Sequence, residues 1–73
     1  MSSALGKIVR AERKKLGLTQ QELADLSVTS MLFISQLERG KMTVRLDKVL
    51  SVLSVLGLEV CIRQGRGGIT GNL

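Results

Sequence analysis

The side chains of this sequence that could do chemistry are hydrogen-bonding and cationic groups rather than catalytic ones. Histidine is absent, and Cys61 is the only cysteine among the 73 residues. A chain with one thiol and no imidazole cannot form a closed structural zinc site, a Ser–His–Asp triad or a Cys–His pair. We therefore expect no enzymatic activity, no metal site and no cofactor. A lone cysteine also excludes an intrachain disulfide, which favours the reducing cytoplasm.

The charge balance indicates a polyanionic partner. Lysine and arginine total 11 against 6 aspartates and glutamates, which gives a formal net charge of +5. This excess favours nucleic acid over a membrane surface. Phe33 is the only aromatic residue, so the chain lacks the stacking platform of proteins that read RNA or single strands. No membrane span or signal peptide is expected, because the apolar stretch 49–58 is too short and Lys7 and Arg10 interrupt the N-terminal segment.

The elements that must position these groups are predicted to be four helices. Apolar residues recur at helical spacing in four segments; in the first, Leu5, Ile8 and Val9 fall near one face. Thr19 and Glu22 have the spacing of a capping box that opens the second helix. Glycine, which commonly follows the last residue of a helix, comes after three of the segments. The predicted helices cover residues 4–16, 20–26, 31–39 and 46–56.

The pattern changes to alternation after the fourth helix. Leu58, Val60 and Ile62 alternate with other residues, which predicts a short, half-buried strand over residues 58–63. Since no other segment resembles a strand, its expected partner is the same strand of a second copy, paired antiparallel across a two-fold axis. We therefore expect a homodimer of a domain spanning residues 1–63, followed by a flexible, glycine-rich tail over 64–73.

Two short helices joined by a tight turn are the parts of a helix-turn-helix, whose second helix docks in the major groove of DNA. The segments GLTQQELADL and FISQLERGK resemble the Xre/phage-repressor helix-turn-helix family. The longer segment FISQLERGKMTVRLDKVLSVLSVLGLEV is similar to the HipB-type antitoxin branch of that family. The resemblance implies an all-α, lambda-repressor-like fold of four to five helices and a sequence-specific repressor of a palindromic operator. It also implies a HipA-like serine/threonine kinase toxin as a protein partner.

The resemblance implies roles for individual residues. It pairs Arg13 with Glu38 in a structural salt bridge and makes residues 31–39 the recognition helix. It implies DNA contacts at the start of the second helix, along the recognition helix and in the loop that follows. These expected contacts are Gln20, Gln21, Ser30, Met31, Leu32, Ser35, Gln36, Arg39, Lys41 and Thr43.

Three residues depart from the family pattern. Val28 lies in the turn where a glycine or small residue is common, so the turn could differ in shape, because β-branched residues resist positive φ. Met31 and Leu32 stand where relatives often carry Gln, Arg or Lys. They cannot form bidentate hydrogen bonds with bases, although they can touch thymine methyl groups. DNA shape and Gln36 would then carry more of the discrimination.

The same departures keep an alternative open. An apolar pair such as Met31 and Leu32 at the start of an otherwise polar helix face also suits a protein-interaction adaptor whose DNA readout is degenerate. Such an adaptor would bind duplexes weakly, without sequence preference and with strong sensitivity to salt. A membrane-surface helix over residues 4–16 is disfavoured, because its apolar face is needed by the core.

Overall fold

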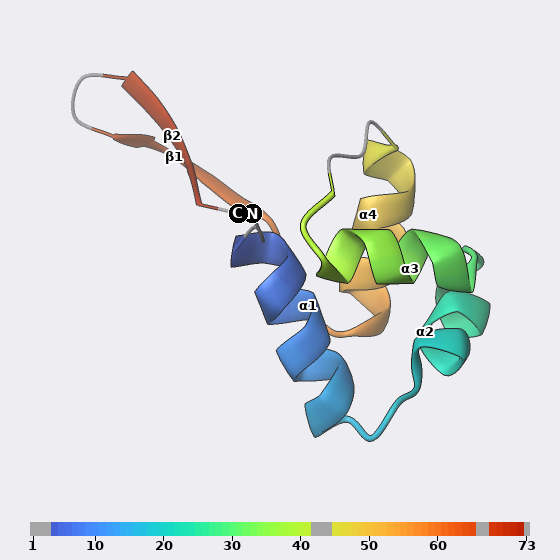
Figure 1. The fold of residues 1–73 in the computed structure, drawn as a ribbon. Coiled ribbons are helices and arrows are strands. Elements are labelled where there is room, and N and C mark those ends of the chain that lie inside the picture. The colour runs from blue at the N-terminus through green and yellow to red at the C-terminus, as the bar shows by residue number, and fades with distance from the viewer. Residues whose placement is uncertain (1–3, 42–44, 66–67, 73) are drawn as a thin grey trace.

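The computed structural model describes residues 4–41, 45–65 and 68–72 of the chain. Its described part contains four helices, followed by a two-stranded antiparallel hairpin (Figure 1). The four helices agree with the predicted ones to within one residue at each end. They are α1 (Ala4–Lys15), α2 (Gln20–Ser27), α3 (Met31–Glu38) and α4 (Leu46–Val55), and the strands are β1 (Cys61–Gly65) and β2 (Gly68–Asn72).

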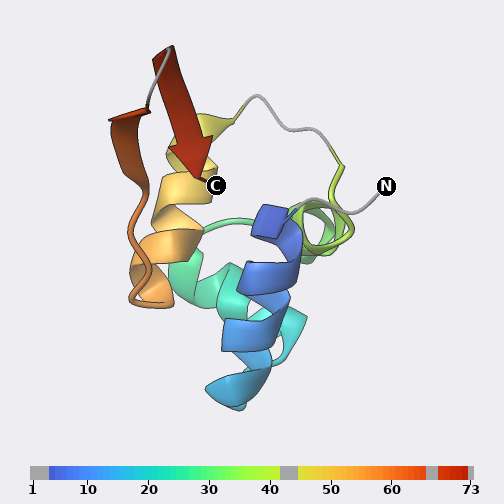
Figure 2. The ribbon, with the colours of Figure 1, turned by 90° about the vertical axis from the view of Figure 1, so that its left-hand side faces the viewer.

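One apolar core holds the four helices together. Each helix contributes a fully buried side chain at its centre, namely Val9 from α1, Leu23 from α2, Ile34 from α3 and Val52 from α4. Figure 2 shows α4 and α1 on different sides of the helical body. Helix α2 contacts both α3 and α4, and α1 contacts α3. None of the described helices is long and apolar enough to cross a membrane. The predicted helical core is therefore confirmed, and it fixes α3 relative to α1 and α2.

Gly6 is the position at which α1 approaches α3 most tightly. A Cβ atom built at Gly6 would lie 2.5 Å from the carbonyl oxygen of Leu37 and 2.8 Å from that of Glu38. Both distances are shorter than real Cβ contacts, so only glycine allows α1 to pack at this depth. The hydrophobic pattern of the sequence does not predict that position 6 must be glycine, because a glycine in a helix ordinarily indicates only weak helix propensity.

The predicted capping box at the start of α2 is confirmed, and α3 also begins with a side-chain cap. The Thr19 hydroxyl accepts a hydrogen bond of 3.0 Å from the Glu22 amide, and the Thr19 amide donates to Glu22 Oε1 at 2.9 Å. Hydrogen bonding from Thr19 to the Glu22 carboxyl, mainly from the Thr19 backbone amide and secondly from its side chain, holds the pKa of that carboxyl below its ordinary value of 4.5. At the start of α3, Ser30 Oγ accepts from the Phe33 amide at 3.0 Å. Local sequence therefore determines where both helices begin.

The C-terminal segment differs from the prediction in where the strand begins. β1 begins at Cys61, so Ile62 lies in the strand but Leu58 and Val60 precede it. Leu58 and Val60 are partly buried and pack against the helical core. Their alternation therefore reflects contact with the core rather than strand pairing.

The partner of β1 also differs from the prediction. β1 pairs antiparallel with β2 of the same chain, from Cys61 opposite Asn72 to Gly65 opposite Gly68. The prediction that no other segment of the chain could pair with the strand is wrong. The expected flexible tail contains the end of β1 and all of β2. Its glycine-rich sequence has no apolar alternation, and hence no sequence signal for a strand.

Candidate nucleic-acid interface

The turn between α2 and α3 contains a residue in the left-handed conformation. Val28 has φ 56° and ψ 46°, and 88% of its surface is exposed. Its amide donates to the carbonyl oxygens of Ala24 and Asp25, and the Thr29 amide donates to Ala24 at 2.9 Å. The turn therefore contains a residue in the left-handed conformation, which favours glycine. Here a β-branched residue adopts that conformation despite its steric cost. Val28 therefore places steric strain in the turn.

Hydroxyl groups attach this turn to the rest of the protein. The buried Ser27 donates to the Leu23 carbonyl at 2.7 Å, and its hydroxyl lies 2.9 Å from that of Thr29. Ser51 of α4 donates to the Ser27 carbonyl at 2.8 Å. Three of the four residues over 27–30 carry hydroxyl groups, a composition typical of turns. The contribution of Ser51, in contrast, depends on a contact between distant residues. Through it, α4 fixes the end of α2 and thus the entry to α3.

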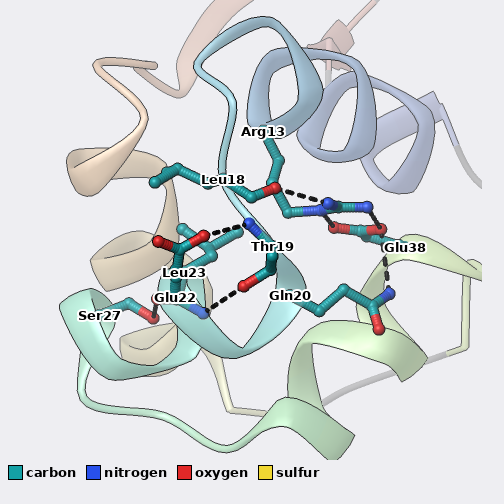
Figure 3. Close-up of polar contacts among 8 residues, drawn as sticks. All are labelled: Arg13, Leu18, Thr19, Gln20, Glu22, Leu23, Ser27 and Glu38. Carbon is teal, nitrogen blue, oxygen red and sulfur yellow. Dashed lines mark hydrogen bonds and ion pairs between the residues drawn. The ribbon is translucent and has the colours of Figure 1, made fainter.

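The opposite end of α3 is held by a buried ion pair (Figure 3). Arg13 Nε donates to Glu38 Oε2 at 2.6 Å, and Arg13 Nη2 donates to Glu38 Oε1 at 3.1 Å. Arg13 Nη1 also donates to the carbonyl oxygen of Leu18 at 2.8 Å. The guanidinium therefore ties the end of α3 to the loop before α2. The predicted structural pairing of Arg13 with Glu38 agrees with this geometry.

The two glutamines at the start of α2 have partners within the protein. Gln20 Nε2 donates to Glu38 Oε1 at 3.2 Å, so this half-buried side chain belongs to the Arg13–Glu38 network (Figure 3). Gln21 Nε2 donates to Asp25 Oδ1 at 2.9 Å on the exposed side of α2. Both residues were expected to contact DNA. Gln20 therefore joins the ion-pair network in the free protein, and contact of either glutamine with DNA stays a prediction.

The start of α3 presents apolar side chains outward. Met31 is 49% and Leu32 is 63% exposed, whereas Ile34 and Leu37 are buried in the core. Ser30, the residue before them, is exposed and caps the helix. The exposed start of α3 therefore has the solvent-facing orientation that a recognition helix needs, with a surface suited to apolar contact.

Polar and basic groups continue from this apolar start toward the other end of α3. Ser35 and Gln36 are half-buried, and Arg39 and Lys41 are exposed directly after the helix. Lys41 is held against the end of the helix, because its amide donates to the Gln36 carbonyl at 2.9 Å. Thr43, also expected to contact DNA, lies outside the described residues. An uncharged helix face therefore lies next to two cations. The cations can bind an acidic backbone that runs beside this polar face.

Comparisons with known proteins agree with this geometry. A family profile described as "Helix-turn-helix" matches residues 9–62. The chain is 43% identical over 58 residues to the uncharacterized HTH-type transcriptional regulator y4mF of Sinorhizobium fredii, covering 80% of this chain and 76% of that protein.

Two crystal structures are similar in fold and sequence. The restriction-modification controller protein C.AhdI from Aeromonas hydrophila has a TM-score of 0.68 and 33% identity, covering 75% of this chain and 80% of that one. The clp gene regulator ClgR from C. glutamicum has a TM-score of 0.67 and 39% identity, covering 77% and 73% respectively. All three relatives are named as regulators or controllers.

Proposed function

Because the chain belongs to the helix-turn-helix family of DNA-binding transcriptional regulators, we propose that it is a repressor that binds a palindromic operator in its own promoter. One observation carries this proposal. The helix α3 is fixed at both ends, by the turn at Val28 and by the Arg13–Glu38 pair, while its outer face is exposed and flanked by Arg39 and Lys41. A rigidly held helix of this kind suits the major groove.

In this proposal the residues of α3 have distinct roles. Gln36 forms a bidentate hydrogen bond with an adenine, and Ser35 contacts an adjacent base or the backbone. Arg39 and Lys41 contact phosphates and so set affinity and register rather than sequence preference. Ser30 caps the helix. Bound across the promoter, the protein blocks access to it.

We further propose that the operator is bound by a homodimer formed through the β1–β2 hairpin. The hairpin points away from the helical body in Figure 1 and has two strands only. A two-stranded hairpin by itself is marginally stable in water, and both of its edges can accept another strand. Pairing with the hairpin of a second copy would complete a larger sheet and set half-sites about one turn, ~34 Å, apart.

The test is a titration of the protein, by fluorescence anisotropy at two salt concentrations, against the duplex directly upstream of its own gene. A shuffled duplex is the control. We expect a preference of ~10³-fold or more for the upstream duplex that persists at the higher salt concentration. Equal binding to both duplexes that disappears with added salt would contradict the proposal and favour the adaptor alternative, for which the exposed Met31 and Leu32 are the supporting observation.

Two variants assign roles within that titration. Gln36→Ala should weaken binding to the operator by ~1–3 kcal/mol and leave binding to the shuffled duplex nearly intact. Lys41→Ala should weaken both and reduce the salt slope by about one. Lys14→Ala, an exposed residue of α1, is the charge-matched control. Equal salt slopes for the Lys41 and Lys14 variants would mean that Lys41 acts only through net charge.

A second candidate role concerns a protein partner. The similarity of residues 33–60 to HipB-type antitoxins supports a HipA-like serine/threonine kinase toxin, which this protein would bind in a repressing complex. The test is size-exclusion chromatography of the purified protein mixed with a kinase encoded beside its gene. A co-eluting complex that binds the operator more tightly than the protein alone would support the antitoxin role, and separate elution would refute it.

A further inference from the structure

We propose that Met31 and Leu32 recognise thymine, through contact of their side chains with the C5 methyl groups in the major groove. This inference rests on the proposed function and names the base that the start of α3 selects. Each half-site would then carry thymine beneath the first turn of α3.

The position of the two side chains supports contact with bases. Ser30 is the N-cap of α3, so Met31 and Leu32 are its first two residues, and the N-terminal residues of a recognition helix are those that contact base edges. Both side chains are about half or more exposed, while Ile34 packs into the core. They are therefore available for a partner and are not needed to complete the fold.

The chemistry of α3 excludes the usual way of reading guanine. The commonest guanine contact is a bidentate hydrogen bond from arginine or lysine, and the sequence of α3, MLFISQLE, contains neither. Glu38 is its one charged residue, and both carboxylate oxygens are engaged by Arg13, with Gln20 sharing Oε1. The helix is thus limited to hydrogen bonds from Ser35 and Gln36 and to apolar contacts. Thymine is the base that offers a methyl group to such contacts.

The surroundings of the pair favour DNA over an apolar protein surface. Met31 and Leu32 continue along the same helix into Ser35 and Gln36, and Arg39 and Lys41 follow as exposed cations. An apolar patch that is part of a basic, hydrogen-bonding surface complements a base edge between two phosphate backbones.

Uracil substitution isolates the methyl group, because uracil pairs as thymine does and differs only by lacking that group. The preferred duplex is first selected from a randomised pool with the full chain, and each thymine is then replaced singly by uracil. Burying one methyl group contributes ~0.8 kcal/mol, which at ~1.4 kcal/mol per factor of ten is about fourfold in affinity. We expect a loss of this size at one or two positions in each half-site and no loss at the others.

Variants of the protein connect the effect to the two side chains. In Leu32→Ala and Met31→Ala, affinity for the thymine duplex should fall severalfold, while affinity for the duplex with uracil at the contacted position should change little. The matched control is Leu26→Ala, an exposed apolar residue of α2, which should keep the full thymine–uracil difference. Circular dichroism and thermal unfolding check that each variant is folded.

The possible failures can be told apart. If the selected duplex binds specifically but equally well with thymine or uracil at every position, methyl recognition is refuted and the proposed function stands. If the pool yields no preferred sequence, the proposed function fails, and this inference with it. A thymine–uracil difference that survives in both alanine variants would also overturn the assignment to Met31 and Leu32.

Discussion

Arg13 and Glu38, which are 25 residues apart, form two hydrogen bonds with each other, and their side chains are only 10% and 3% exposed. Removing one partner of such a pair leaves a charge buried without compensation. We therefore expect Glu38→Ala to lower the free energy of unfolding by ~3–5 kcal/mol. Replacing both, as in Arg13→Met with Glu38→Leu, should lower it by less than Glu38→Ala alone. Urea unfolding of the single and double variants measures this coupling, and additive losses would contradict it.

Gly6→Ala should destabilise the protein, although the same change in an exposed helix stabilises it by up to ~1 kcal/mol. The added Cβ would meet the backbone carbonyl groups of Leu37 and Glu38 at 2.5 and 2.8 Å. We expect a loss of ~1–3 kcal/mol, because backbone atoms cannot move aside as a flexible side chain can. Lys7→Ala, at the exposed neighbouring position, is the control and should stay within about 0.5 kcal/mol of wild type. A gain in thermal stability for Gly6→Ala would show that α1 can shift away from α3.

Val28→Gly should stabilise the protein. Val28 holds φ 56° in the turn between α2 and α3, and the left-handed region costs a residue with a Cβ roughly 1–2 kcal/mol. Glycine removes this strain but adds entropy to the unfolded chain, so we expect a net gain of about 0.5–1 kcal/mol. Val28→Ala retains the Cβ and serves as the comparison. A glycine variant no more stable than the alanine variant in urea unfolding would show that the turn is not strained.

Ser30 lies both at the cap of α3 and at the predicted DNA surface. Two substitutions separate its role in stability from its role in DNA binding. Ser30→Ala removes the hydrogen bond to the Phe33 amide and should cost ~1 kcal/mol of stability. Ser30→Asp preserves the cap and places a negative charge where the helix dipole favours it, so stability should be retained. In the operator titration, however, the aspartate should weaken binding more than the alanine does, because it repels phosphates. Equal DNA affinities for the two variants would place Ser30 outside the interface.

The capping box predicts a specific dependence of stability on pH. Because hydrogen bonds from Thr19 hold the pKa of Glu22 below 4.5 in the folded protein, its contribution is complete above the unfolded-state pKa. It is lost as the pH falls through the lower, folded-state pKa. Glu22→Gln should therefore be less stable than wild type at neutral pH, and the difference should shrink toward about pH 3. Urea midpoints of both proteins across this range test it, and a constant difference would contradict the role of the carboxylate.

Local sequence alone determined the four helices and the caps at the starts of α2 and α3. Thr19 and Glu22 satisfy each other within one turn, and Ser30 satisfies the amide three residues later. Interactions of this range are encoded by spacing, so a sequence pattern is enough to locate them. The predicted pairing of Arg13 with Glu38 came from family resemblance, since no local spacing connects the two residues.

Tertiary structure decided what depends on atoms from distant parts of the chain. It brought the side-chain amide of Gln20 to Glu38, and it made Ser51 a support of the α2–α3 turn. It also required glycine at position 6 and paired β1 with a strand that has no apolar alternation. Each of these results follows from backbone and side-chain groups meeting in three dimensions. Periodicity along the chain does not predict such contacts, because the free energy of each contact depends on both segments together and not on either one alone.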